Sequence, residues 1–349
     1  MSISFSEILD NLVKDAFLPM DSFISEHKIP CASLGVVTRE GKQAFHFSGY
    51  AQLIPEKERL TRHHWFDLAS LTKVMATTPA LLKLVDNGFI DLDSPLTEAI
   101  PDLRQYEVNT AYERGLTFRD CLTHNTELPA VEPLYTYGDD PNRLRHFILQ
   151  NPWKRVSVPV YSDINFILIG IAIERLTGLP LRALALPPGL TYGASPDLAV
   201  ATENCVFRHH VLKGEVHDEN AWALGGAAGH AGLFGTIEGV LHFAYSLLTG
   251  EGASDKAIRA MRQRSANPKR SIGWECKSDN WAGGQACSGQ TIGHTGFTGT
   301  GLWIDFQRGI AWTLLTNRVH PTRFSGVPMQ SIRKQVSDRI IEGWDKVYL

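Results

Sequence analysis

The sequence has few cysteines and none of the cysteine spacings that mark a disulfide framework or a zinc site. Five cysteines occur in 349 residues, and no two of them form a Cys-x-x-Cys pair. They are widely scattered, at Cys31, Cys121, Cys205, Cys276 and Cys287. Disulfide scaffolds and structural zinc sites need an even or closely spaced set. We therefore expect free thiols, no zinc site and a reducing compartment.

The chain also lacks an excess of positive charge and a long apolar run, and we expect no secretory leader. Lys plus Arg total 34 against 37 Asp plus Glu, a net charge of −3, which does not favour nucleic acid as a partner. The longest apolar run, Phe166 to Ile173, is far shorter than the roughly 18 residues of a membrane span. The first lysine is Lys14, so no basic region precedes an apolar segment. We expect a soluble, cytoplasmic protein that binds a small-molecule or peptide substrate.

Apolar and alternating runs near both ends of the chain predict β-strands joined as hairpins. The predicted elements are a helix over 5–27, strands over 31–38 and 43–49, strands over 301–306 and 310–316, and a helix over 328–348. Two hairpins at opposite ends of a chain can pair into one sheet. The fold class predicted is α/β (α+β): an antiparallel sheet from both chain ends, flanked by helices.

The middle of the chain is richer in helical patterns that end at glycine. Helices are predicted over 142–150, 165–177 and 238–248, and Gly178 and Gly250 end the last two. The segment 179–196 holds four prolines and predicts a long loop. These patterns predict a mainly helical domain over 89–270, inserted between the two parts of an α/β domain, 1–88 and 271–349. We expect the active site in the cleft between them.

Ser70 and Lys73 form the most informative pair of residues. Residues three apart lie on the same helix face, so the Lys73 amine can reach the Ser70 hydroxyl and take its proton. The helix that follows, from Val74 to Leu82, is apolar nearly all round and is predicted to be buried. Its N-terminus stabilises developing negative charge. A simple N-cap role for Ser70 is the alternative.

The spacing Ser-x-x-Lys is not unique to Ser70. It recurs at Ser25 with Lys28, at the end of the first amphipathic segment, and at Ser331 with Lys334, in the charged C-terminal helix. Both patterns are typical of solvated helix faces, so we expect neither pair to be catalytic.

Three motifs in order resemble those of the serine β-lactamase and penicillin-binding-protein superfamily, most closely its class C and esterase-like branch. They are Ser70-x-x-Lys73, Tyr161-Ser162-Asp163 and His294-Thr295-Gly296. The resemblance covers roughly residues 30 to 320 and implies a β-lactamase/transpeptidase-like fold with no cofactor.

The resemblance also implies roles for the motif residues. Ser70 would be the acylated nucleophile and Lys73 its proton acceptor, while Tyr161 would protonate the leaving group. The backbone N–H groups of Ser70 and Phe297 would form the oxyanion hole. His294, Thr295 and Gly296 would line the edge where the substrate docks.

Two positions depart from the family pattern. Asp163 stands where an asparagine is usual, and it could hydrogen-bond Lys73 and keep it cationic, or cap the helix. His294 stands where a lysine is usual, which replaces a permanent cation by a group that titrates near neutral pH. We expect Lys73 to be the general base, with a pKa tuned by desolvation and an activity that rises with pH.

The stretch 216–221 and the glycine-rich segment that follows it, 225–235, contain His217, Asp218 and His230 and leave three interpretations open. They could form a metal site, a tight turn before the helix near Glu238, or a substrate-facing loop near Ser70. No His-x-x-x-His spacing supports the metal.

This segment, with Thr316 to Pro321, resembles a subgroup that acts on bacterial cell-wall fragments, including serine-type amidases of muropeptides. The sequence therefore predicts a serine hydrolase that cleaves an amide bond in peptidoglycan-derived peptides. A carboxylesterase for small esters and a catalytically silent peptide-binding protein are the alternatives.

Overall fold

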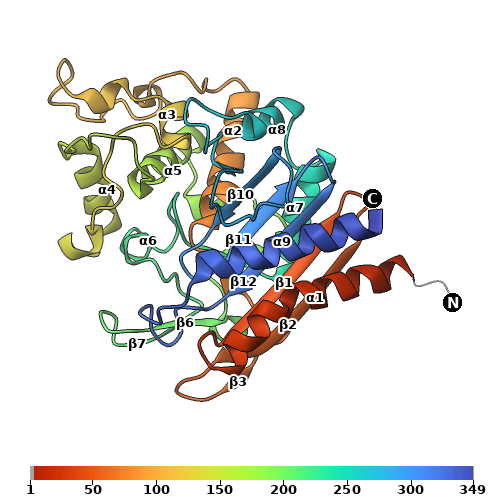
Figure 1. Cartoon of the computed structure of the whole chain (residues 1–349). Helices are drawn as coiled ribbons and strands as arrows, with labels where there is room; N and C mark the ends of the chain where they lie inside the picture. The colour runs from red at the N-terminus through yellow and green to blue at the C-terminus, as the bar shows by residue number, and fades with distance from the viewer. Residues whose placement is uncertain (1–3, 349) are drawn as a thin grey trace.

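The computed structural model describes residues 4–348 and contains one large sheet built from both ends of the chain (Figure 1). Its seven strands are all antiparallel, in the order β3-β2-β1-β12-β11-β10-β9. Their bounds are β1 Cys31–Thr38, β2 Gln43–Gln52, β3 Glu58–Arg59, β9 Glu275–Cys276, β10 Thr291–Thr295, β11 Gly301–Asp305 and β12 Ile310–Thr316. The predicted fold class and the pairing of the two terminal hairpins are confirmed.

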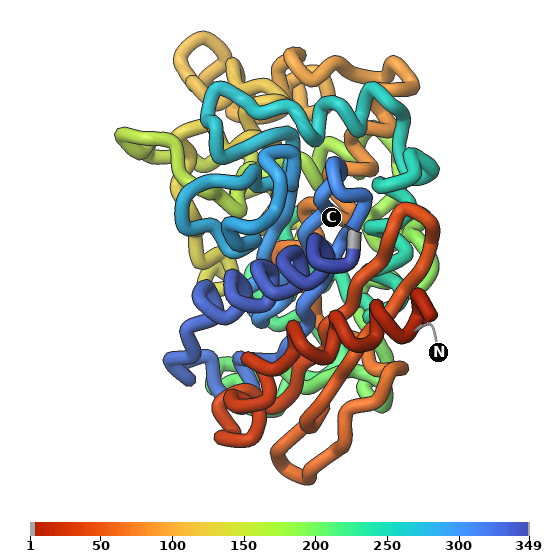
Figure 2. Tube along the Cα trace, turned by 45° about the vertical axis from the view of Figure 1, so that its right-hand side comes forward, coloured from red at the N-terminus to blue at the C-terminus, as the bar shows by residue number. Residues whose placement is uncertain are grey.

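Helices cover both faces of this sheet. On one face α1 and α9 lie side by side, and their apolar residues pack on β1 and β12 (Figures 1 and 2). On the other face α7 packs on the same two strands. The helices are α1 Phe5–Ser25, α2 Thr78–Asp86, α3 Phe118–Leu122, α4 Pro141–Gln150, α5 Asp163–Thr177, α6 Glu219–Ala223, α7 Ile237–Thr249, α8 Asp255–Arg262 and α9 Met329–Tyr348.

The segment predicted as a long loop, 179–196, contains a short strand instead. Strand β5 (Leu190–Tyr192) pairs with β8 (Leu233–Gly235), which also pairs with β4 (Phe66–Asp67). A two-stranded hairpin, β6 (Ala201–Cys205) with β7 (His210–Lys213), completes the strands. The loop prediction was wrong at β5 because a three-residue strand carries no periodic pattern. Through β8, the glycine-rich segment is joined to β4, which leads directly to Ser70.

The helix that follows Ser70 begins with a wide turn. Residues Lys73–Thr77 form a π-helical turn that continues into α2, and the N–H of Thr78 bonds to the carbonyl of Lys73. Pro79 has no N–H and its ring crowds the carbonyl four residues earlier, which favours a wider turn at this point. The predicted buried helix is present, but its widened first turn was not predicted.

None of the helices in the described part of the chain is both long enough and apolar enough to cross a membrane.

Candidate active site

The residues predicted to form the site converge on one cleft of about 900 Å³. Nine of them line it: Ser70, Tyr161, Asp163, His217, Asp218, His294, Thr295, Gly296 and Phe297. Lys73 and His230 lie just behind its wall and are almost fully buried. The three motifs, which are far apart in the sequence, are therefore brought together.

Lys73 lies at the centre of the polar contacts in the site. Its Nζ donates hydrogen bonds to Ser70 Oγ at 2.9 Å, to Asp163 Oδ1 at 2.7 Å and to the carbonyl oxygen of His230 at 3.2 Å. Three acceptors satisfy the three N–H groups of an ammonium. The first of the two roles considered for Asp163, binding to Lys73, is the one observed.

The ionisation of Lys73 differs from the sequence-based expectation. Burial lowers its pKa more than any other single influence, but the charge of Asp163 and contacts with Asp163 and Tyr161 together outweigh burial. The net pKa therefore lies above the ordinary value for lysine. Desolvation is the largest single influence on the pKa, as expected, but the partner carboxylate only 2.7 Å away and Tyr161 make the net shift upward. The role of Lys73 as general base stays a prediction.

The turn before Ser70 is held in an uncommon backbone conformation. Ala69 has φ of +48°, which non-glycine residues rarely adopt. Buried Asp67 accepts the Ala69 N–H at 2.8 Å and the His217 N–H at 2.6 Å. Asp67 thus ties the Ser70 turn to the segment that contains His217 and Asp218.

Tyr161 completes the group around Ser70. Its phenol interacts with the side chains of both Ser70 and Lys73, and the Lys73 Nζ lies 4.9 Å from its ring centroid. His124 packs on the same ring with 4.5 Å between ring centroids and accepts the Ser162 N–H at 3.0 Å. Burial raises the pKa of Tyr161, although the nearby Lys73 charge acts in the opposite direction. The phenol therefore keeps its proton at neutral pH.

His294 is neutral at neutral pH, because its pKa lies well below the usual range for histidine. Burial, followed by the positive charges of Arg270 and Lys73, holds its pKa well below the usual range. Its Nδ1 donates to the carbonyl of Thr295 at 2.9 Å, while its buried Nε2 has no protein partner among residues 4–348. The expectation of titration near neutral pH was wrong because burial, and then two neighbouring cations, disfavour a charged imidazolium here.

The two amides predicted to form an oxyanion hole are both free. Within the described part of the chain, neither the Ser70 nor the Phe297 backbone N–H has a protein acceptor. Ser70 N lies at the start of the helix that contains Lys73, and Phe297 lies in the turn directly after the third motif, on the cleft wall. Two free donors that line the same cleft as the Ser70 hydroxyl are suited to stabilise a tetrahedral oxyanion.

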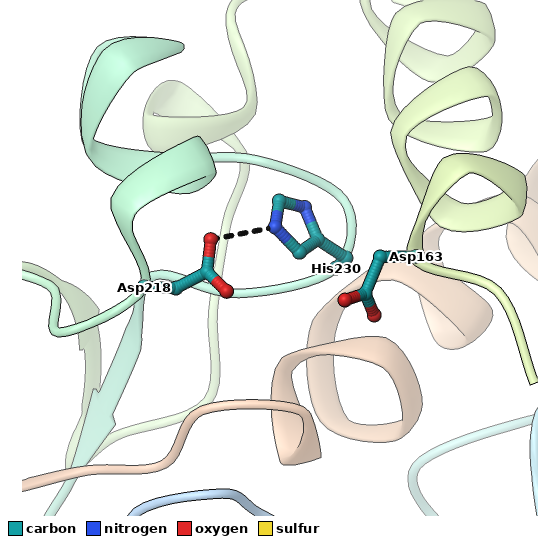
Figure 3. A group of neighbouring side chains, drawn as sticks. All are labelled: Asp163, Asp218 and His230. Carbon is teal, nitrogen blue, oxygen red and sulfur yellow. Dashed lines mark hydrogen bonds and ion pairs between the residues drawn. The ribbon is translucent and has the colours of Figure 1, made fainter. Parts of the chain in front are cut away.

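The glycine-rich segment brings its polar residues to the cleft, although they separate into two pairs. His217 donates to Glu203 at 3.0 Å, and His230 Nε2 donates to Asp218 Oδ1 at 2.9 Å (Figure 3). Burial raises the pKa of Asp218, but its contacts with His230 and with the Ala221 N–H outweigh burial, and the pKa lies below its ordinary value.

Asp163, Asp218 and His230 are close enough together to hold a metal ion, with ligand atoms within 4.8 Å of one another (Figure 3). Lys73 already supplies a positive charge to Asp163, and His230 uses its Nε2–H on Asp218. These contacts account for the cluster without an ion.

Several arginines in the cleft were not identified from the sequence. Arg318 and Arg333 donate to the carbonyls of Phe297 and Gly296, at 2.8 and 2.7 Å, and among residues 4–348 neither forms an ion pair. Arg270 lies over the Tyr161 ring, with 5.2 Å between its guanidinium carbon and the ring centroid. Nothing in their local sequence distinguishes these residues from surface arginines, because their placement depends on tertiary contacts.

The other two Ser-x-x-Lys pairs lie outside the cleft. Ser25 and Ser331 are both exposed, as their polar surroundings predicted.

Comparison with known proteins gives a consistent result. The family model described as beta-lactamase matches residues 5–335. An N-acetylmuramyl-L-alanine amidase of Bacillus subtilis (strain 168) is 28% identical over 317 residues, covering 77% of this chain and 71% of the relative. A putative D-alanyl-D-alanine carboxypeptidase of Salmonella typhimurium is 30% identical over 324 residues, covering 78% of this chain and 75% of the relative.

Solved structures share the fold at low sequence identity. A beta-lactamase from Sulfitobacter sp. EE-36 has a TM-score of 0.73 at 18% identity and covers 99% of both chains. EstCE1, a hydrolase with promiscuous acyltransferase activity, has a TM-score of 0.72 at 18% identity and covers 96% of this chain and 99% of its own. At this identity the similarity concerns the fold alone.

Proposed function

The chain belongs to the beta-lactamase family, and from that premise we propose that it is a serine hydrolase that forms an acyl-enzyme on Ser70 and cleaves an amide bond in peptidoglycan-derived peptides. The observation that carries this proposal is the contact of Ser70 Oγ with Lys73 Nζ, at 2.9 Å, inside a cleft that also contains Tyr161. A hydroxyl with an amine and a phenol in reach has the groups needed for nucleophilic catalysis.

Acylation requires a proton acceptor for Ser70. Lys73 fills this role after its ammonium has lost a proton to solvent by way of Asp163, whose side chain is 21% exposed. The Ser70 oxygen then attacks the substrate carbonyl carbon while its proton passes to the Lys73 amine. Negative charge develops on the carbonyl oxygen, where the Ser70 and Phe297 amides stabilise it.

Collapse of the tetrahedral intermediate breaks the carbon–nitrogen bond. The departing nitrogen takes the Tyr161 proton, and Lys73, which holds the proton from Ser70, reprotonates the phenolate. A water molecule then attacks the acyl carbon with the same groups in the reverse roles. The raised pKa of Tyr161 supports this assignment, because a phenol that stays protonated at neutral pH can act as a general acid.

The positive wall of the cleft supports a peptide substrate. Arg318 and Arg333 line the cleft beside the third motif. Among residues 4–348 neither has a hydrogen bond to a carboxylate, although the charge of Glu275 acts on Arg333. Guanidinium groups match the geometry of carboxylates. Stem peptides carry free carboxylates. Two relatives are named N-acetylmuramyl-L-alanine amidase and putative D-alanyl-D-alanine carboxypeptidase, names that also support a peptide substrate of this kind.

A carboxylesterase is the second candidate. It is favoured by His294, which is neutral where the family pattern has a lysine cation, so a substrate without a carboxylate meets no charged partner at that position. A silent binding protein has less support, since Ser70, Lys73 and Tyr161 are all in mutual contact.

Comparing kcat/KM on matched substrates distinguishes the amidase from the carboxylesterase. We expect a muramyl peptide with a free carboxylate to be cleaved with a kcat/KM at least about tenfold above that of its amidated form, and above that of a short p-nitrophenyl ester. Efficient ester cleavage with no amide cleavage would favour the esterase instead.

A further inference from the structure

The oxyanion hole is assembled from two segments that are far apart in the sequence, and two threonines join them. We propose that Thr298 and Thr300 are positioning residues that set the separation of the Ser70 and Phe297 amides. This inference rests on the proposed function, because it concerns how well the hole fits the transition state of that reaction.

The first segment is the turn 67–70, which ends at Ser70. The second is the loop 296–300, which carries the Phe297 amide. No covalent link or strand pairing connects the two segments, since β4 pairs with β8 whereas β10 pairs with β9 and β11. Their relative position therefore depends on side-chain and packing contacts between them.

The two threonine hydroxyls supply these contacts. Thr298 Oγ1 donates to the carbonyl of Asp67 at 2.8 Å, and Thr300 Oγ1 donates to the carbonyl of Leu68 at 3.1 Å. Both threonines are buried, with 1% and 0% of their surface exposed. Two successive carbonyls of the Ser70 turn are thus bound by one loop, which fixes both the distance and the rotation between the segments.

The loop approaches the turn too closely for a larger residue. A Cβ at Gly296 would lie 2.6 Å from the Leu68 carbonyl oxygen and 2.1 Å from Thr300 Oγ1. From the opposite side Arg333 donates to the carbonyls of Gly296 and Thr300, at 2.7 and 2.8 Å. The loop is therefore held between α9 and the Ser70 turn, and the threonine hydroxyls define its contact with the turn.

Neither hydroxyl is free to touch substrate, because each already donates to a backbone carbonyl. They affect catalysis indirectly, because they position the Ser70 and Phe297 amides. A displacement of about 1 Å in a reacting group can cost about 100-fold in rate, and loss of one oxyanion donor costs about 100- to 1,000-fold in kcat. Loss of either hydroxyl should slow the reaction by less than these factors, because the second hydroxyl and Arg333 still hold the loop.

The experiment compares Thr298→Val and Thr300→Val with Thr298→Ser and Thr300→Ser. Thr313→Val is the matched control, because buried Thr313 Oγ1 donates to the carbonyl of Gly301 at 2.8 Å, between β11 and β12 and outside the cleft lining. For each variant we would measure the rate of Ser70 labelling by a fluorophosphonate, kcat and KM on a p-nitrophenyl ester, and the thermal midpoint.

We expect each valine variant to label about 10- to 100-fold more slowly, with kcat lowered and KM changed less than about threefold. The serine variants should recover most of the rate because they keep the hydroxyl. Thr313→Val should lower the thermal midpoint by a similar amount without slowing the labelling. If a valine variant does not fold, the alanine variant at the same position takes its place.

Valine variants that label as fast as Thr313→Val, or serine variants that do not recover, would overturn the inference alone. A wild-type protein that is not labelled at Ser70 would overturn the proposed function and this inference together, so the two failures are distinguishable.

Discussion

At the scale of single residues, the charge of Lys73 decides how the site works. The spacing of Ser70 and Lys73 was sufficient to predict their contact, and the 2.9 Å distance agrees. The protonation state could not be predicted, because it depends on Asp163 at 2.7 Å, ninety residues further along the chain. A pair on one helix turn is a local property, whereas a pKa sums contributions from the whole cleft.

Replacing Asp163 by asparagine should shift the pH dependence of acylation toward acid. Asp163 raises the Lys73 pKa, so its removal lets burial dominate and lowers that pKa. The wild-type acylation rate should rise throughout pH 5–9, whereas Asp163→Asn should reach its plateau at least about one pH unit earlier. Single-turnover acylation measured from pH 5 to 10 tests this. Superimposable profiles for the two proteins would contradict the role given to Asp163.

Tyr161→Phe should slow the cleavage of amides much more than the cleavage of activated esters, because the two leaving groups differ in their need for a proton. An amide nitrogen must be protonated to leave, whereas p-nitrophenolate leaves without a proton. We expect amide cleavage to fall about 100- to 10,000-fold and acylation by the activated ester to fall far less. Phenylalanine retains the ring that packs on His124. An equal loss on both substrates would argue that Tyr161 positions Ser70 instead of acting as an acid.

At the scale of elements, close backbone approach explains the glycine-rich segment. A Cβ on Gly229 would lie 1.9 Å from the Phe166 carbonyl oxygen in α5, and the Gly229 carbonyl accepts the Thr77 hydroxyl at 2.6 Å. The segment thus packs between α5 and the wide turn Lys73–Thr77. The sequence left a metal site, a tight turn and a substrate-facing loop open here, but the need for glycine comes from helix contacts that no local pattern encodes.

Gly229→Ala should therefore destabilise the fold by about 3 kcal/mol and lower activity with it. Gly115→Ala is the control, because nothing lies within 4 Å of the added Cβ there. Urea unfolding of both variants gives the comparison. A Gly229→Ala protein as stable as Gly115→Ala would mean that α5 and this segment separate easily.

The longer strands and helices were predicted well, whereas short elements such as α3, α6 and α8 were not. The strand 31–38 matches β1, and 310–316 matches β12. The π-helical turn at Lys73–Thr77 and the short strand β5 were missed, because they depend on Pro79 and on pairing with β8.

At the scale of the whole molecule, the helical middle and the sheet share one hydrophobic core. A single cluster of buried residues runs from Leu315 and Ile304 in the sheet through α2 to Phe166 and Ile169 in α5. We propose that 89–270 is an insertion in the α/β domain, with boundaries near residues 88 and 270. Through the shared core, the insertion holds Tyr161 and Asp163 against the Ser70 helix.

Buried neutral histidines should make the whole fold sensitive to acid. Burial lowers the pKa of His320 to about 4, although its contact with Thr202 acts in the opposite direction. The unfolded chain therefore binds more protons than the folded chain between pH 6.5 and 4, so stability falls as pH falls through that window. His320 accounts for at most about 3 kcal/mol of this loss.

The His320 contribution can be isolated with His320→Gln. Free energies of urea unfolding at pH 7 and pH 4.5 should differ less for this variant than for the wild type. His320 accepts the Leu53 N–H and donates to the Thr202 carbonyl, and a glutamine amide can offer the same two functions without titrating. An undiminished difference would assign the acid sensitivity to other groups.

Covalent capture of the nucleophile tests the central claim most directly. After treatment with a fluorophosphonate, intact-mass analysis of the wild type should show one adduct, and peptide mapping should place it on Ser70. Ser70→Ala should show none, while Ser25→Ala, at the exposed copy of the same spacing, should react like the wild type. An adduct that persists in Ser70→Ala, or a wild-type protein that stays unlabelled from pH 5 to 10, would contradict the account.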